Sequence, residues 1–267
     1  MSSLPEYEDY EKFVELQQNL YRARFSLKVV GFAYPSAVFL IHLPSTKDCI
    51  LVDSGDPENI TKLLKALSLH FETFSEYKLK YVAITHGHFD HTGALLKLLE
   101  DYEDIKFIIG EQEIPFVIHG KKYSEIKGDT ITFQILKHFF AEGKPIGNED
   151  KFIVIKEGEE HKFEFYNILR PIFTPGHTPG SLSYLHIPTN SILIGDLVFN
   201  VPLVPVFSMK SSISIPISTT SVSDSKISIK KICEMENEIK LVFPGHDLEK
   251  NGISIEEFKL FAQKNLN

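Results

Sequence analysis

The sequence predicts a mixed α/β fold, and the order of its expected elements is the main reason. Short runs rich in β-branched and aromatic residues alternate with stretches in which apolar residues recur at helical spacing. Two β-rich blocks are each followed by helices, which hints at two similar halves. With 267 residues, 43% of them hydrophobic, the chain is long enough for one large core. We therefore expect one globular domain over residues 1–267.

The first half of the chain is predicted to open with a helix and to continue with strands. Residues 6–23 carry apolar side chains at helical spacing, which predicts an amphipathic helix in an N-terminal extension of about residues 1–24: Tyr10, Phe13, Val14, Leu20 and Tyr21. Asp56-Pro57 is typical of a helix start, so residues 57–71 are expected to be helical. The remaining elements here are three strands within 25–52, strands at 81–84 and 106–109, and a helix around 95–99.

The second half is predicted to be mostly β-structure that ends in helices. Residues 119–150 are polar, rich in lysine and without clear periodicity, and are expected to form an insertion or lid-like loop with some helix. Strands are expected at 151–155, 161–165, 171–174, 181–187, 191–194 and 241–243, and helices at 224–238 and 254–264. An irregular stretch, 198–221, follows the strand at 191–194. It either shapes a substrate pocket or only covers the domain or a partner subunit.

Composition and charge argue against several classes of protein. The net charge of −8 disfavours a nucleic-acid substrate, because a phosphate backbone would be repelled on average. Cys49 and Cys233 are far apart and form no CxxC motif, so neither a disulfide framework nor a thiolate metal site is expected. The acidic N-terminus lacks the build of a signal or transit peptide, and no apolar run approaches the ~18 residues that span a bilayer. A cytoplasmic protein without membrane contact is the expectation.

The residues that carry chemistry gather first in the segment HGHFDH. His86, His88, Asp90 and His91 are four potential metal ligands within six residues, directly after a predicted strand. Imidazole nitrogens and carboxylate oxygens suit zinc, iron or manganese. If His86 and His88 face one ion, Asp90 and His91 can reach a second, and Gly87 lets the backbone pass close by.

Three more potential ligands follow strands in the same way. His177 lies in the Pro- and Gly-rich turn TPGHTPG, Asp196 ends the apolar strand LIGD, and His246 follows the last strand in PGHD. A buried carboxylate is costly unless it is paired or bound to a cation, so Asp196 is the natural bridge between two ions. Each histidine alone is unremarkable, but four strand ends that each present a ligand predict one converging metal site.

These motifs, HGHFDH, GHTPGS, GD and PGH in that order, resemble the metallo-β-lactamase superfamily over about residues 28–250. The resemblance implies a four-layer αββα sandwich with the site at one edge. It also implies that His86, His88 and His177 hold one ion, that Asp90, His91 and His246 hold another, and that Asp196 is shared. The implied cofactors are two divalent metal ions, most often Zn²⁺, with Mn²⁺ or Fe²⁺ possible. Asp53 resembles a strand-end aspartate that orients a ligand, with turn capping as the alternative.

Such a site predicts hydrolysis. Two cations roughly 3.5–4 Å apart lower the pKa of a shared water toward about 7, and the resulting hydroxide would attack a carbonyl carbon while Asp90 relays a proton. The expected partner is a small carbonyl substrate, an ester, lactone or thioester, and a homodimer is possible. Two alternatives stay open: a mononuclear iron enzyme similar to the persulfide dioxygenases, and a metal-binding partner protein without turnover.

Departures from the family's subgroups narrow the expected substrate. The aspartate at position 196, where one subclass of β-lactamases has a cysteine, and the paired Asp90 and His91 disfavour an antibiotic substrate. Only 21 residues follow His246, which disfavours the helical domain that glyoxalase II proteins append. Homoserine lactone lactonases typically carry a tyrosine where this chain has Phe199, and ribonuclease Z-like enzymes need a basic surface that a net charge of −8 does not suggest.

Overall fold

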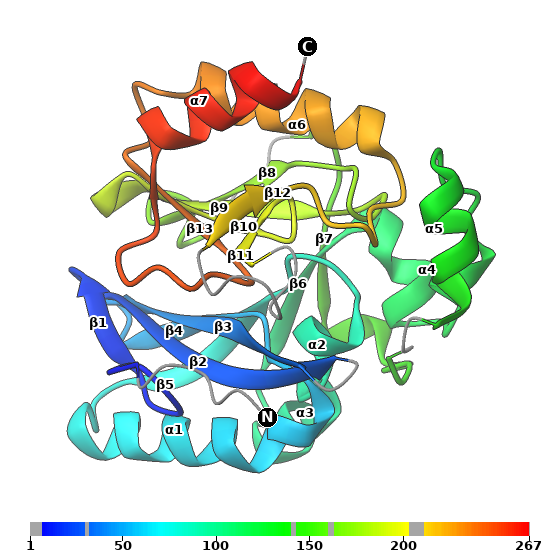
Figure 1. Cartoon of the computed structure of the whole chain (residues 1–267). Coiled ribbons are helices and arrows are strands. Elements are labelled where there is room, and N and C mark those ends of the chain that lie inside the picture. The colour runs from blue at the N-terminus through cyan, green and yellow to red at the C-terminus, as the bar shows by residue number, and fades with distance from the viewer. Residues whose placement is uncertain (1–6, 30–31, 140–142, 160–162, 203–210, 267) are drawn as a thin grey trace.

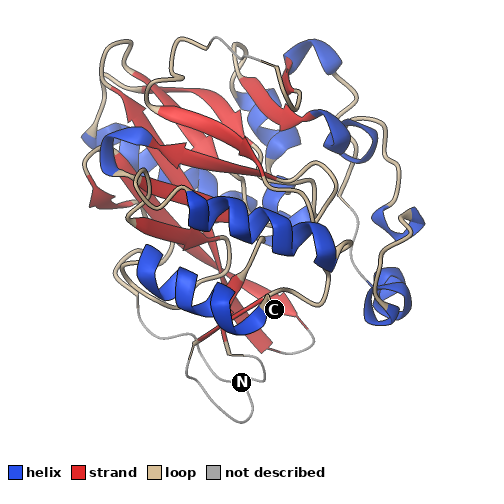
Figure 2. Cartoon of the chain, turned by 90° about the horizontal axis from the view of Figure 1, so that it is seen from above, coloured by secondary structure: helices blue, strands red, loops and turns tan. Residues whose placement is uncertain are grey.

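The computed structural model describes residues 7–29, 32–139, 143–159, 163–202 and 211–266. Two β-sheets face each other, and helices cover the outer face of each sheet (Figure 1). Helices α1 and α3 lie below the first sheet, and α6 and α7 lie above the second. Seen from above, α6 and α7 lie across the strands beneath them (Figure 2). The four-layer αββα sandwich predicted from the sequence is therefore confirmed.

The first sheet contains seven strands in sequence order, and the second contains five. Neighbouring strands of the first sheet are antiparallel from β1 to β4 and parallel from β4 to β7. The first sheet consists of β1 (Val14–Gln17), β2 (Leu20–Val29), β3 (Phe32–Leu43), β4 (Asp48–Val52), β5 (Lys78–Ala83), β6 (Lys106–Gly110) and β7 (Phe152–Ile155). The second has the order β14-β13-β10-β9-β8. Its members are β8 (Leu169–Phe173), β9 (Leu182–His186), β10 (Ser191–Gly195), β13 (Leu241–Pro244) and β14 (Ile253–Ser254). A separate hairpin joins β11 (Phe199–Val201) to β12 (Ser212–Ser214).

Side chains cap the 3₁₀ helix before α1 and the α-helices α5, α6 and α7 by accepting a free N–H group. Asp56 accepts a hydrogen bond from the Glu58 amide at 2.8 Å before the first of them, and Ser254 caps the last with Glu257. The α-helices are α1 (Ile60–Thr73), α2 (Phe89–Thr92), α3 (Leu95–Asp101), α4 (Ile114–Val117), α5 (Ile131–Leu136), α6 (Val222–Glu234) and α7 (Ile255–Asn265). Short 3₁₀ helices occupy Pro57–Asn59, Glu111–Glu113, Tyr123–Glu125, Lys137–Phe139, Glu149–Lys151 and Ile187–Thr189. Among the described residues no helix combines the length and the apolarity that crossing a bilayer requires.

Three apolar layers stabilise the sandwich. Because successive side chains of a strand point to opposite faces of the sheet, one strand contributes residues to two of these layers. In β4, Cys49 and Leu51 pack toward α1 and α3, whereas Ile50 and Val52 pack between the two sheets. A third cluster lies between the second sheet and the pair α6 and α7. Strands buried on both faces read as continuous apolar runs, which is why the sequence located them well.

The predicted N-terminal helix over residues 6–23 is wrong. The described part of this segment contains β1 and β2, joined by a turn in which Asn19 has φ = 62°. Arg22 and Arg24 are only 1% exposed, because Asp9 and the carbonyls of residues 249–250 bind their guanidinium groups. Buried arginines are rare, so the alternating polar and apolar residues of LYRARF did not indicate a strand that is buried on both faces.

One predicted strand is also wrong, and parts of two other predicted segments lie outside the described residues. The strand predicted at 161–165 is absent at 163–165, where the chain turns: Ile168 N–H binds the carbonyl of Phe165 at 2.8 Å. Phe165 nevertheless packs on Tyr81, with ring centroids 4.8 Å apart. This apolar side chain therefore anchors a turn to the core and does not belong to a strand. Residues 160–162, and the parts 140–142 and 203–210 of the predicted lid-like loop and pocket wall, lie outside the described residues.

Candidate metal centre

The seven predicted ligands lie together at one edge of the sandwich, because each of them follows a strand or sits in a turn between strands. The HGHFDH segment follows β5 and enters α2. His177 occupies the turn from β8 to β9, Asp196 comes directly after β10, and His246 comes two residues after β13. The structure brings them into two groups of ligand atoms, each within 4.8 Å of one another. We call them the first group (His86, His88, His177) and the second group (Asp90, His91, Asp196, His246).

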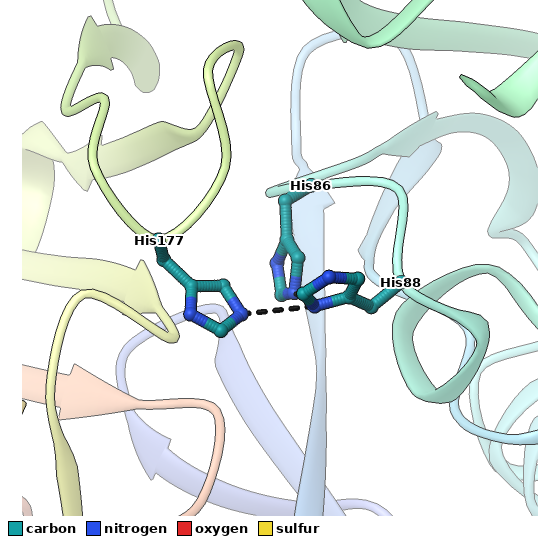
Figure 3. Close-up of side chains that lie close together, drawn as sticks. All are labelled: His86, His88 and His177. Atoms are coloured by element: carbon teal, nitrogen blue, oxygen red, sulfur yellow. Dashed lines mark hydrogen bonds between the residues drawn. The ribbon is translucent and has the colours of Figure 1, made fainter. Parts of the chain in front are cut away.

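The first group consists of three imidazoles whose nitrogens face one point (Figure 3). His88 Nδ1 lies 2.9 Å from His177 Nε2 and 3.1 Å from His86 Nε2. The rings of His88 and His177 meet nearly edge to face, with centroids 4.7 Å apart. The fold thus brings a nitrogen of His177 into contact with one of His88, which lies 89 positions earlier in the sequence.

The second group combines two imidazoles with two carboxylates. His246 Nε2 lies 3.3 Å from Asp90 Oδ2, and His91 Nε2 lies 3.2 Å from Asp196 Oδ1. Asp196 also reaches the first group, since its Oδ2 is 3.4 Å from His177 Nε2 and 3.8 Å from His86 Nε2. The carboxylate of Asp196 therefore lies between the two groups, where the sequence placed a bridge.

Burial keeps the first group neutral. It lowers the pKa of His86 well below its usual value, lowers that of His88, and lowers that of His177 to about 3. The mutual proximity of the imidazoles adds to the effect in His86 and His177. A neutral imidazole is the state in which histidine binds a cation.

The carboxylates have the opposite effect in the second group. Burial lowers the pKa of His91, but Asp196, Asp53 and Asp90 raise it well above its usual value. Burial also raises the pKa of Asp196, yet His91 and His246 outweigh it and hold this pKa well below the usual range. The pKa of Asp90 is lowered in the same manner. Without a cation, this group is thus a set of mutually charged partners.

The donor set fits divalent cations. His91 Nε2 and Asp196 Oδ1 are buried and face each other without hydrogen-bond geometry, so neither has a hydrogen-bond partner among the described residues. Unpaired polar atoms in a protein interior are costly, and a cation between nitrogen and oxygen donors removes that cost. Five imidazoles and two carboxylates are borderline-to-hard donors of the kind that bind zinc, manganese or iron.

Hydrogen bonds behind the ligands decide which ring nitrogen faces the site. Asp53 accepts the Thr85 amide and the Thr85 hydroxyl, each at 2.8 Å, and its Oδ2 lies 2.8 Å from His91 Nδ1. Because the Thr85 hydroxyl hydrogen goes to Asp53, its oxygen accepts from His86 Nδ1 at 3.1 Å. His246 Nδ1 donates to the Pro35 carbonyl at 2.8 Å. All three rings therefore present Nε2 toward the site.

Three features of the site surroundings were absent from the sequence analysis. Glu113 is fully buried and binds the ligand loops, as described below. A cavity of about 220 Å³ lies beside Gly87. Its rim includes Lys121, Lys122 and Lys144, and no described residue forms an ion pair with these three ammonium groups. The lysine-rich composition of 119–150 was visible in the sequence, but its position beside the HGHFDH loop was not.

Phe199 lies at another edge of the site. Its ring centroid is 4.7 Å from that of His246, nearly edge to face. The neighbouring Asn200 amide N–H binds the His246 carbonyl at 2.9 Å, and its side chain donates to Asp247 at 2.8 Å. The described part of the predicted pocket wall thus contacts the loop that carries His246.

Comparison with known proteins gives a consistent result. Residues 31–246 match the model of the metallo-beta-lactamase superfamily. The chain is 27% identical to the probable metallo-hydrolase YflN of Bacillus subtilis over 224 residues, which are 80% of this chain and 81% of that protein. It is 26% identical to the hydroxyacylglutathione hydrolase of Buchnera aphidicola subsp. Baizongia pistaciae, over 84% of this chain and 66% of that enzyme.

Solved structures share the fold at lower identity. The archaeal superfamily protein ST1585 from Sulfolobus tokodaii superimposes with a TM-score of 0.61 at 21% identity, covering 92% of this chain and 86% of that one. A metallo-beta-lactamase from Erythrobacter litoralis gives a TM-score of 0.64 at 13% identity, covering 98% and 100%. At these identities the likeness concerns the fold.

Proposed function

The chain belongs to the metallo-beta-lactamase superfamily, and from this we propose that it hydrolyses a small ester, lactone or thioester with two divalent cations, Zn²⁺ foremost. Membership of this family and relatives such as YflN already indicate a metal-dependent hydrolase. The observation that carries the proposal is the meeting of five imidazoles and two carboxylates at one edge of the sandwich.

The first group would hold one cation and the second group the other, with Asp196 between them. Bound there, the cations supply Lewis acidity and lower the pKa of water toward neutrality. The protein itself keeps the histidine nitrogens in the protonation state and orientation that bind a cation. Burial holds the first group neutral, and Asp53 accepts a hydrogen bond from His91 Nδ1 so that Nε2 faces inward.

Asp90 is the carboxylate placed to move a proton. Its side chain is 11% exposed, against 4% for that of Asp196, so it is the less buried of the two carboxylates. Burial raises its pKa, but His91 and His246 outweigh burial and hold this pKa below the usual range, so the group is ionised near neutral pH. In the proposed reaction Asp90 would accept the proton that the attacking water loses as its oxygen bonds to the acyl carbon, and would donate it to the leaving oxygen or sulfur as the acyl bond breaks.

The surroundings favour a substrate with an apolar portion and a negative charge. Phe199 supplies an aromatic wall beside His246. Lys121, Lys122 and Lys144 surround a cavity next to the HGHFDH loop in a chain whose net charge is −8. An acyl compound that carries a carboxylate or phosphate would gain from those ammonium groups. The relatives named hydroxyacylglutathione hydrolase support a thioester among the candidates.

The test combines metal analysis with a substrate panel. The purified protein should contain about two divalent ions per chain and hydrolyse a lactone, an aryl ester or a thioester, with anionic members preferred over neutral ones. Asp196→Asn should abolish this turnover. Asp48→Asn, which alters a buried carboxylate at the opposite end of β4 from Asp53, should keep it. Turnover that survives complete metal removal would refute the proposal, and one iron per chain without ester turnover would favour the oxygenase alternative.

A further inference from the structure

Glu113 is a fully buried carboxyl group that no sequence motif singles out. It ends the 3₁₀ helix that follows β6, and 0% of the residue is exposed. Its Oε2 accepts the Gly87 amide N–H at 2.8 Å, and its Oε1 accepts the Gly180 amide N–H at 2.8 Å. Gly87 lies between His86 and His88, and Gly180 comes three residues after His177. One side chain therefore ties together the two loops that supply the whole first group.

Tyr123 supports this carboxyl group from the other side. Its hydroxyl donates to Glu113 Oε2, and its ring lies 4.6 Å from that of His88, edge to face. The ring also stacks on Phe116, with centroids 4.2 Å apart. Tyr123 belongs to the 119–150 segment, so the segment that sequence analysis left as an insertion contacts the metal loop through this residue.

The packing at this point leaves no room for side chains on the two glycines. A Cβ on Gly87 would lie 2.2 Å from the Tyr123 hydroxyl oxygen and 2.9 Å from Glu113 Oε2. A Cβ on Gly180 would lie 2.8 Å from Glu113 Oε1. Real Cβ contacts essentially never fall below 3.0 Å, so both glycines are needed for the backbone to reach the carboxyl group.

We infer that Glu113 is a positioning residue that sets the separation of the two loops and thereby the affinity of the first group for its cation. The inference rests on the proposed function, since it assumes that the first group binds a metal. Both oxygens of Glu113 accept backbone N–H groups, a pattern that only a carboxylate completes. An amide at this position has one oxygen, so its NH₂ would face the second N–H.

The experiment measures Zn²⁺ affinity by competition with a chromophoric chelator in two backgrounds. Asp90→Ala leaves the first group intact, and His177→Ala leaves the second. Glu113→Gln should weaken Zn²⁺ binding about 10- to 100-fold in the Asp90→Ala background and less than about threefold in the His177→Ala background. Glu111→Gln, two residues earlier on the same 3₁₀ helix and exposed, is the matched control and should change neither affinity.

The outcomes separate the possible failures. Unchanged affinity of Glu113→Gln in the Asp90→Ala background would overturn the inference while leaving the proposed function standing. Equal weakening in both backgrounds would also overturn it, because general destabilisation does not select one group. A parent chain that binds no Zn²⁺ would overturn the inference and the proposed function together. If Glu113→Gln does not fold, Tyr123→Phe takes its place: Zn²⁺ affinity should fall in the Asp90→Ala background and stay unchanged in the His177→Ala background, and unchanged affinity in both would overturn the inference.

Discussion

Replacing Asp53 with asparagine should weaken metal binding at the second group without disturbing the fold. Asp53 has φ = 61°, a left-handed conformation that asparagine adopts as readily as aspartate, so the substitution adds no backbone strain. The asparagine oxygen can still accept the Thr85 amide, as Asp53 Oδ1 does now. Its NH₂ would then occupy the place of Oδ2, 2.8 Å from His91 Nδ1.

That exchange reverses the hydrogen bond behind His91. An NH₂ group is a donor, so His91 can keep the contact only by accepting at Nδ1 and carrying its proton on Nε2. Nε2 is the atom that lies 3.2 Å from Asp196 and would bind the cation. Loss of such an orienting partner costs about 10- to 100-fold in metal affinity, which corresponds to about 1.4–2.7 kcal/mol.

The assay is a Zn²⁺ titration against a chromophoric chelator, with unfolding of the metal-free protein followed alongside. Asp48→Asn is the control, because it makes the same chemical change at a buried carboxylate that pairs with Lys80 at 3.1 Å, away from the site. Two tight Zn²⁺ sites with unchanged affinity in Asp53→Asn would refute the reasoning about His91.

Three other predictions follow from the described contacts. His42 and His70 are buried with their Nε2 atoms 2.7 Å apart, and burial lowers the pKa of each to about 4. Their contribution to stability is therefore complete above pH 6.5 and lost as the pH falls toward 4. The drop in unfolding free energy over this range, measured by urea denaturation, should be smaller in His70→Phe. Asp9→Ala should cost about 3 kcal/mol in the same assay, because it strips the buried Arg22 of its carboxylate partner at 2.5 Å. Phe199→Tyr places a hydroxyl beside His246 and should raise kcat for lactones by up to about tenfold relative to aryl esters, measured by initial rates.

The sequence could predict where the seven ligand candidates lie, because each is tied to the end of a buried strand. All of β10 and the end of β5, Tyr81–Ala83, are buried and easy to locate, and the residue after a strand end has little freedom. Once the strands form two facing sheets, His86 and Asp196 have to meet at one edge. Local pattern and global arrangement agree there, which is why the convergence of these side chains could be expected from the sequence.

The residues that support the ligands were less predictable, since their roles depend on contacts distant in sequence. Glu113 acts on backbone groups 26 and 67 positions away, and no spacing rule connects them. The misread N-terminal segment has the same cause. Arg22 and Arg24 look like surface residues until Asp9 and the carbonyls of 249–250 are placed around them. Polar side chains that are buried for a specific partner carry no periodic signal of their own.

The two groups differ in charge, and this difference suggests how the site works as a unit. The first group consists of imidazoles that burial keeps neutral, so it relies on rigid placement, which Glu113 and the two glycines provide. The second group contains two carboxylates. Their negative charge attracts a cation, but it also raises the pKa of His91 and His246, which favours their protonated forms when no cation is bound. A cation entering the second group must therefore displace protons, whereas one entering the first group meets free lone pairs. If both groups hold a cation as proposed, lowering the pH should empty the second group before the first, as a Zn²⁺ titration against a chromophoric chelator at successively lower pH would show. Equal loss from both groups would contradict this expectation.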